Sequence, residues 1–286
     1  MTPVQLIVGA FEIGLLLGGA VLLLLTFLSP ARREAWLGVN RLSPWALTGY
    51  EAALLFVTIF LTGFVGQGVL GRIFGDMLKH SADRAALEVI VYGVGFHGFA
   101  LLGWPLFGLL RRHLYTDYGA VPPAVEPSPR LPSGRLLLTA AATLCAALPV
   151  LSAISLGWTF LLEKLGLPAE PQDLLAIFSD SHSPAVAAGM LFVACVLAPV
   201  NEELLFRAGF YRYCRQRWGR AAGLLLSATC FAALHGNLAG FLPLALLGAA
   251  LALAYERTGD IRVPIAMHAL FNLNTVLILA SGLPQT

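Results

Sequence analysis

Residues 185–207 read AVAAGMLFVACVLAPVNEELLFR. The uncharged part ends before Glu202 and Glu203, and Arg207 follows four residues after Glu203. The apolar part of this run predicts a helix that crosses a membrane. An ionisable side chain at the centre of such a helix costs at least ~2.5–3.5 kcal/mol, so it normally faces a cavity lined by protein or water. The three charged residues therefore mark a polar site within a membrane helix.

The composition of the whole chain is that of a membrane protein. Of its 286 residues, 58% are hydrophobic and only 12% are charged, whereas soluble domains carry roughly 25% charged residues. Long apolar runs recur along the chain and predict an all-α, polytopic transmembrane helical bundle. We expect about eight spans, at residues 5–28, 47–71, 86–110, 136–162, 185–206, 221–237, 240–255 and 263–281. The four cysteines have no paired spacing, so neither disulfides nor a thiolate metal site is expected.

The basic residues are distributed unevenly over the two sets of loops that these spans would create. Of the 18 lysines and arginines, only four lie in one set, namely Arg72, Lys79, Arg84 and Lys164. The positive-inside rule places the other set, with the remaining basic residues, in the cytoplasm. Both termini are then predicted to lie outside it. The apolar run near the N-terminus is expected to be a retained first span rather than a signal peptide.

Proline divides the chain into two regions. Residues 121–132 read VPPAVEPSPRLP, and such a density of proline disfavours both helix and sheet. We therefore predict an N-terminal three-helix transmembrane region at residues 1–115 and a cytoplasmic linker at 116–134. A five-helix region that carries all the polar motifs is predicted at 135–286.

Two further motifs place polar residues in apolar helices. Phe231 and His235 are spaced i,i+4 near the end of the sixth span, and His268 and Asn272 have the same spacing in the eighth. Counted at 1.5 Å per helical residue from the nearest cytoplasmic arginines, the polar residues of all three motifs lie about 9–22 Å deep. Against a hydrocarbon core of about 30 Å, they are expected to meet near mid-depth.

Helical spacing assigns the two adjacent glutamates different roles. Glu203 and Arg207 are i,i+4, the spacing of an intrahelical ion pair, whereas Glu202 points about 100° away. One carboxylate is therefore expected to be structural and the other chemical. Pro199 and Pro264 are expected to kink two of the helices and to open room for water.

These residue types suit the hydrolysis of a peptide bond without a nucleophilic side chain. Glu202 is a plausible base to activate water. His235 could hold the same water or donate a proton to the leaving amine. His268 and the amide of Asn272 could direct N–H donors at the developing oxyanion.

The three motifs together resemble those of a known family. They are EExxxR (Glu202, Glu203, Arg207), FxxxH (Phe231, His235) and HxxxN (His268, Asn272). In this order, over roughly residues 140–279, they are similar to the CAAX protease and bacteriocin-processing family, intramembrane endopeptidases that include the type II CAAX prenyl endopeptidase. The resemblance implies that Glu202 and His235 activate water and that His268 and Asn272 stabilise the oxyanion. It implies supporting roles for Glu203, Arg207 and Phe231, and a glutamate-dependent mechanism with no metal or other cofactor.

Other interpretations of the same residues stay open. Two histidines and a carboxylate could bind Zn²⁺, although no HExxH is present and Arg207 would lie near the metal. The cavity could also bind a peptide without cutting it, as in an immunity or scaffold protein. A transporter is less favoured because no internal repeat is evident. A lone histidine on an apolar helix is usually a structural group, and His97 and His182 are interpreted in that way.

The expected partners are the lipid bilayer and a membrane-embedded or lipid-anchored peptide or protein substrate, with no nucleic acid. Prenylated C-terminal tails, leader peptides and C-terminal sorting tails are all compatible with the sequence. A bacterial cytoplasmic membrane is the expected location.

Overall fold

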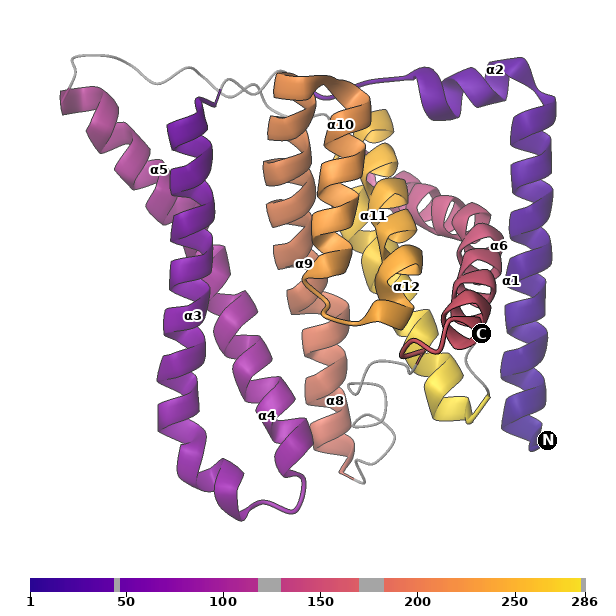
Figure 1. The fold of residues 1–286 in the computed structure, drawn as a ribbon, viewed down its shortest axis with the longest axis horizontal. Coiled ribbons are helices and arrows are strands. Elements are labelled where there is room, and N and C mark those ends of the chain that lie inside the picture. Colours follow the sequence, from indigo (N-terminus) through magenta and orange to yellow (C-terminus); the bar gives the residue numbers. More distant parts are fainter. Residues whose placement is uncertain (44–46, 118–129, 170–182, 284–286) are drawn as a thin grey trace.

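The computed structural model describes residues 1–43, 47–117, 130–169 and 183–283, and within these ranges every regular element is a helix (Figure 1). The N-terminal elements are α1 (Pro3–Leu28), α2 (Pro30–Arg33), η1 (Glu34–Gly38), α3 (Gly49–His80), α4 (Arg84–Gly93), η2 (Val94–Gly98) and α5 (Phe99–Asp117). The C-terminal elements are α6 (Ser133–Lys164), α8 (Pro184–Phe192), η3 (Val193–Leu197), α9 (Ala198–Glu203), η4 (Leu204–Tyr211), α10 (Arg212–Ala233), α11 (Leu238–Thr258) and α12 (Arg262–Ser281). The four η elements are π-helical. The predicted all-α fold is confirmed.

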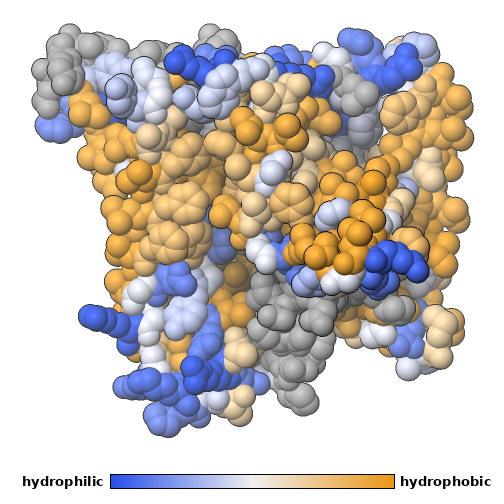
Figure 2. All heavy atoms as spheres, viewed as in Figure 1, coloured by the Kyte–Doolittle hydropathy of each residue, from blue (hydrophilic) through white to orange (hydrophobic). Residues whose placement is uncertain are grey.

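Long apolar helices make up most of the molecule. Among the described residues, seven are long and apolar enough to cross a membrane, namely Pro3–Leu28, Gly49–His80, Arg84–Tyr115, Ser133–Lys164, Pro184–Ala233, Leu238–Thr258 and Arg262–Ser281. Figure 2 shows apolar residues gathered in a broad band across the middle of one face, with hydrophilic residues above and below it. The chain is therefore an integral, multi-pass membrane protein.

Two predicted spans, 185–206 and 221–237, both lie within Pro184–Ala233, which counts as one of these seven helices. The expected number of about eight spans therefore stays a prediction. Gly219 interrupts this stretch with φ 87° and ψ 173°, a backbone conformation that suits glycine. The chain reverses its direction there, so that α10 runs back beside the helix that precedes it (Figure 1).

The helices form two groups around the central stretch α8–η4. On one side, α3 packs against α4, η2 and α5, whereas α1 packs against α6 and α12 on the other side (Figure 1). The side-chain amide of Gln5 donates to the carbonyl oxygen of Gly282 at 3.2 Å. The start of α1 and the end of α12 therefore lie at the same end of the bundle. Which end faces the cytoplasm stays a prediction, as does the linker, of which residues 118–129 lie outside the described ranges.

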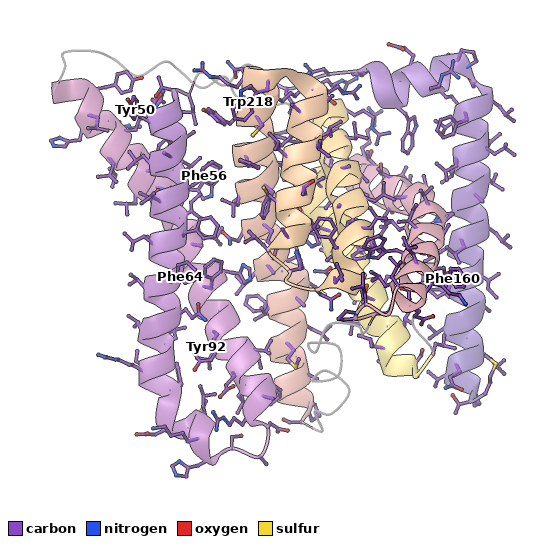
Figure 3. The ribbon with its side chains drawn as sticks, in the orientation of Figure 1. Tyr50, Phe56, Phe64, Tyr92, Phe160 and Trp218 are labelled. Atoms are coloured by element: carbon purple, nitrogen blue, oxygen red, sulfur yellow. The ribbon has the colours of Figure 1, made fainter. Side chains whose placement is uncertain are left out.

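The opposite end of the bundle carries α2 and the chain reversal near Gly219 (Figure 1). It is called the basic end below, after arginines such as Arg215, Arg220 and Arg262. Tyr50 and Trp218 lie at this end (Figure 3), and both side chains are exposed, as is common for aromatic residues at a membrane surface. Its buried acids are paired. Glu256 accepts from Arg215 and Arg220, each at 2.8 Å.

Asp260, in the turn between α11 and α12, is the second paired acid of the basic end. Its carboxylate binds the Arg262 guanidinium at 2.6 Å and accepts from the backbone N–H of Leu131 at 2.9 Å. Burial opposes ionisation of Asp260, but these hydrogen bonds outweigh it and lower the pKa of the carboxyl below its usual value. The turn is thereby fixed to the chain that leads into α6.

Candidate active site

The buried ion pair of Glu203 and Arg207 lies at the centre of the molecule. Both side chains are 0% exposed, and the Arg207 Nε atom is 3.1 Å from Glu203 Oε2. The Nε–H direction is not aligned with the oxygen, so the contact is an ion pair rather than a hydrogen bond. The i,i+4 pair predicted from the sequence is therefore present, and neither charge is isolated in the interior.

Aromatic rings and a close backbone complete the surroundings of Arg207. Its guanidinium carbon lies 4.4 Å from the centre of the Phe231 ring, and Nη2 donates to the carbonyl oxygen of Gly248 at 3.2 Å. A Cβ atom at Gly248 would lie 3.2 Å from Ala228 Cα and 3.3 Å from Arg207 Nη2. The glycine thus allows α11 to approach both α10 and the buried cation.

His268 lies between the two glutamates. Its Nδ1 atom is 2.8 Å from Glu203 Oε1, and its Nε2 atom is 3.9 Å from Glu202 Oε2. Because a carboxylate can only accept, Nδ1 carries the proton in this contact. Glu203 therefore binds Arg207 through one oxygen and orients the His268 ring through the other. Glu202 is the more accessible carboxylate, with 19% of its side chain exposed.

The Phe231 ring connects the histidines. It is fully buried, and its centre lies 4.8 Å from that of His235 and 5.7 Å from that of His268, with edge-to-face geometry in both pairs. His235 follows the end of α10, where its Nδ1 atom donates to the carbonyl oxygen of Phe231 at 2.8 Å. In the neutral ring this contact places the proton on Nδ1 and makes Nε2 an acceptor.

The Asn272 side chain contacts the backbone of the helical stretch that carries the glutamates. Its side-chain amide donates to the carbonyl oxygen of Ala194, in η3, at 2.7 Å. In a π-helix this carbonyl would accept from the residue five positions later, which is Pro199 and has no N–H. The preceding bond of this kind, from Ala198 to Val193, is present. Asn272 therefore satisfies a carbonyl that proline leaves without its donor.

The second proline expected to kink a helix does not do so. Pro264 lies in the first turn of α12, where backbone N–H groups have no partner within the helix. Pro199 instead directly follows the π-helical segment η3 and lies in the first turn of α9. The irregular backbone at the site thus comes from one proline and from π-helical turns, which are common at functional sites.

The structure thus brings six of the seven predicted residues into one contiguous cluster, and it places Asn272 one turn along α12 from His268. Among the described residues, no group of three or more His, Cys, Asp or Glu side chains is arranged as metal ligands would be. Instead, Glu203 contacts Arg207 through one oxygen and Nδ1 of His268 through the other. The cluster offers one accessible carboxylate, two oriented imidazoles and one amide.

Two residues that were not predicted to belong to the site, Asn201 and His97, lie beside this cluster. Asn201, only 1% exposed, precedes Glu202, and its Nδ2 atom is 3.2 Å from Nδ1 of His97 in η2. His97 is close enough to interact electrostatically with Glu202 and His268. The Asn201 Oδ1 atom is buried without a hydrogen-bond partner. The other histidine interpreted as structural, His182, lies outside the described residues.

Close helix packing brings His97 to this position. A Cβ atom on Gly93 would lie 2.7 Å from Val193 Cγ1, and one on Gly189 would lie 2.8 Å from Ile90 Cδ1. Glycine at both positions lets α4 and η2 approach α8 and η3. Its presence in apolar helices is general to membrane bundles, so the sequence alone gave no signal for this contact.

We predict that Phe231→Ala destabilises the protein by about 3–5 kcal/mol, the usual cost of truncating a buried phenylalanine. The change also removes the aromatic face over Arg207. Thermal unfolding in detergent measures the effect. Phe160→Ala is the matched control, because Phe160 also has a cation over its ring, Lys164 at 5.4 Å, but is 60% exposed. Equal destabilisation by the two changes would contradict the central position of Phe231.

Comparison with known proteins agrees with the motifs. Residues 184–274 match the family model of the type II CAAX prenyl endopeptidase Rce1-like proteins. An uncharacterized 24.3 kDa protein of Escherichia coli is 36% identical over 115 residues, which cover 38% of this chain and 52% of that protein. The UPF0177 protein YbdI of Lactococcus lactis subsp. lactis (strain IL1403) is 31% identical over 104 residues, or 35% of this chain and 53% of that protein.

The matches therefore span about half the length of these curated relatives. No solved structure gives a significant match. The family match includes all seven predicted site residues, from Glu202 to Asn272, in the order of the three motifs. Residues 184–274 are therefore similar to the Rce1-like family of type II CAAX prenyl endopeptidases.

Proposed function

We propose that the protein is an intramembrane endopeptidase that hydrolyses peptide bonds in membrane-associated peptides or protein C-terminal tails. The observation that carries the proposal is the pairing of an accessible carboxylate, Glu202, with an imidazole that a second, buried carboxylate orients. A contact of 3.9 Å between Glu202 Oε2 and His268 Nε2 is too long for a direct hydrogen bond but suits a bridging water. The family match supports the same chemistry.

In the proposed reaction, Glu202 takes a proton from water while the oxygen of that water attacks the peptide carbonyl carbon. His235, with Nδ1 bonded to a backbone carbonyl, can accept a hydrogen bond from the same water through Nε2. The proton then passes to the nitrogen of the scissile bond, the C–N bond breaks, and a carboxylate and an amine result.

Two groups could stabilise the tetrahedral oxyanion. Glu203 holds a proton on Nδ1 of His268, so Nε2 becomes a donor only when the ring is the imidazolium ion. Asn272 directs one amide hydrogen at Ala194, which leaves its second amide hydrogen for the oxyanion. The oxyanion role is therefore proposed for His268 as imidazolium and for one N–H of Asn272.

We predict that Glu202→Ala and His235→Ala each abolish cleavage while the protein still folds and inserts. The measurement compares peptide termini in membranes and medium, by mass spectrometry, between cells that express wild type and each variant. His80→Ala is the matched control for His235, because its Nδ1 atom contacts the carbonyl oxygen of Asp76 at 2.8 Å in the same i,i−4 manner, far from the site. Glu163→Ala, at an exposed position, is the control for Glu202.

Termini that disappear in both site variants, but not in the controls, would identify the substrate and show whether it is prenylated. If both site variants cut normally, the proposal fails. Variants that lose cleavage but keep full biological activity would favour a peptide-binding protein instead. Exhaustive chelation tests the alternative of a zinc-dependent protease, because only a metal-dependent enzyme would lose activity and regain it with Zn²⁺.

We further predict that Asn201→Ala slows cleavage about 5- to 150-fold, because a lost hydrogen bond to a buried group costs about 1–3 kcal/mol. The His97 ring would lose the partner that fixes it near Glu202. Asn274→Ala is the matched control, since Asn274 donates at 3.2 Å to Glu12 on another face of the bundle. A wild-type rate in Asn201→Ala, with unchanged melting, would show that the Asn201–His97 contact has no part in the reaction.

A further inference from the structure

A second polar cavity lies at the basic end, away from the glutamates. It has a volume of about 350 Å³, and α2–η1, α6 and the end of α11 surround it. Its lining includes Trp36, Arg41, Leu138, Thr139, Arg257 and Thr258. Figure 1 shows the α2–η1 segment crossing the end of the bundle above α6, and Ala35 and Trp36 of this segment line the cavity. The proposed peptidase does not use this cavity.

Two arginines face the cavity without an acidic partner. The Arg257 guanidinium carbon lies 4.1 Å from the centre of the Trp36 ring, and Nη2 donates to Thr143 Oγ1 at 2.7 Å. Arg41 is close enough for the two guanidinium groups to repel each other. Among the described residues, neither arginine forms an ion pair, and no carboxylate lines the cavity.

The two acids that flank Arg257 and Thr258 in sequence, Glu256 and Asp260, cannot neutralise this pair, because both are already engaged. Glu256 binds Arg215 and Arg220, and Asp260 binds Arg262 and the backbone of the chain before α6. The last carbonyls of α11 offset part of the charge on Arg257, but only as a partial negative charge. The partly enclosed cavity therefore holds two positive charges without a counterion, and a bound anion would neutralise them.

The α6 wall of the cavity carries exposed apolar side chains. Leu138, on its α6 wall, is 71% exposed, and its neighbour Leu137 is 57% exposed. Trp36 lies at the level of the basic end, where tryptophan is common at a membrane surface. Guanidinium groups match the oxygens of phosphate in bidentate geometry, and basic pockets between membrane helices bind anionic lipid headgroups.

We propose that this cavity binds a phosphate group, and that an anionic phospholipid supplies it, with the headgroup on Arg41 and Arg257 and an acyl chain along the exposed face of α6. The Trp36 ring holds the Arg257 guanidinium in place, and Thr139 adds a hydroxyl group to the lining. Binding fixes the α2–η1 segment against α6 and α11.

Native mass spectrometry of the full-length protein in detergent tests this proposal. The probes are phosphatidylglycerol and phosphatidylcholine with identical acyl chains. We expect wild type to prefer phosphatidylglycerol by about tenfold or more, and Arg257→Gln to remove most of this preference. Arg217→Gln is the matched control, because Arg217 is exposed at the basic end on α10 and the change removes the same charge. Arg41→Gln is a second test, because this exposed side chain can be replaced without disturbing buried contacts.

Equal binding of the two lipids by wild type, or equal losses in Arg257→Gln and Arg217→Gln, would overturn the proposed lipid binding. A test with inorganic phosphate distinguishes a phosphate group supplied by a lipid from free phosphate in solution. If millimolar phosphate raises the melting temperature of wild type but not of Arg257→Gln, and no lipid preference is seen, the phosphate site stands and the lipid source is wrong.

Discussion

The buried pair of Glu203 and Arg207 is the interaction on which the rest of the site depends. Both charges are fully enclosed, so each is tolerable only because the other is present. The second oxygen of Glu203 orients His268, and the guanidinium packs on Phe231, whose ring in turn contacts both histidines. One ion pair thereby fixes the relative positions of α9, α10, α11 and α12. The accessible Glu202 is left for chemistry.

The second constraint is the irregular backbone around the glutamates. Pro199 leaves the carbonyl of Ala194 without its π-helical donor, and Asn272 supplies a replacement from α12. On the other side of α9, Asn201 binds His97 from η2. The helix with the glutamates is therefore attached through polar contacts on two sides, and the N-terminal region contributes a histidine to the surroundings of the site.

Much of this arrangement could be predicted from the sequence. The all-α fold follows from apolar runs, and the Glu203–Arg207 pair follows from i,i+4 spacing, because both depend only on local periodicity. The His97–Asn201 contact joins residues 104 positions apart through close packing at glycines, which no local pattern reveals. The reversal at Gly219 lies between the spans predicted at 185–206 and 221–237. The backbone role of Asn272, in contrast, depends on a π-helical turn that has no sequence signature.

The central claim is that, of the two adjacent glutamates, Glu203 stabilises the structure and Glu202 takes part in the chemistry. The most direct test is to measure the stability of Glu202→Gln and Glu203→Gln side by side by thermal unfolding in detergent, which needs no substrate. Glu203→Gln leaves Arg207 buried without a counter-charge, so we expect a loss of about 3–5 kcal/mol. Glu202→Gln should melt close to wild type. Equal stability of the two variants, or a larger loss in Glu202→Gln, would contradict the account.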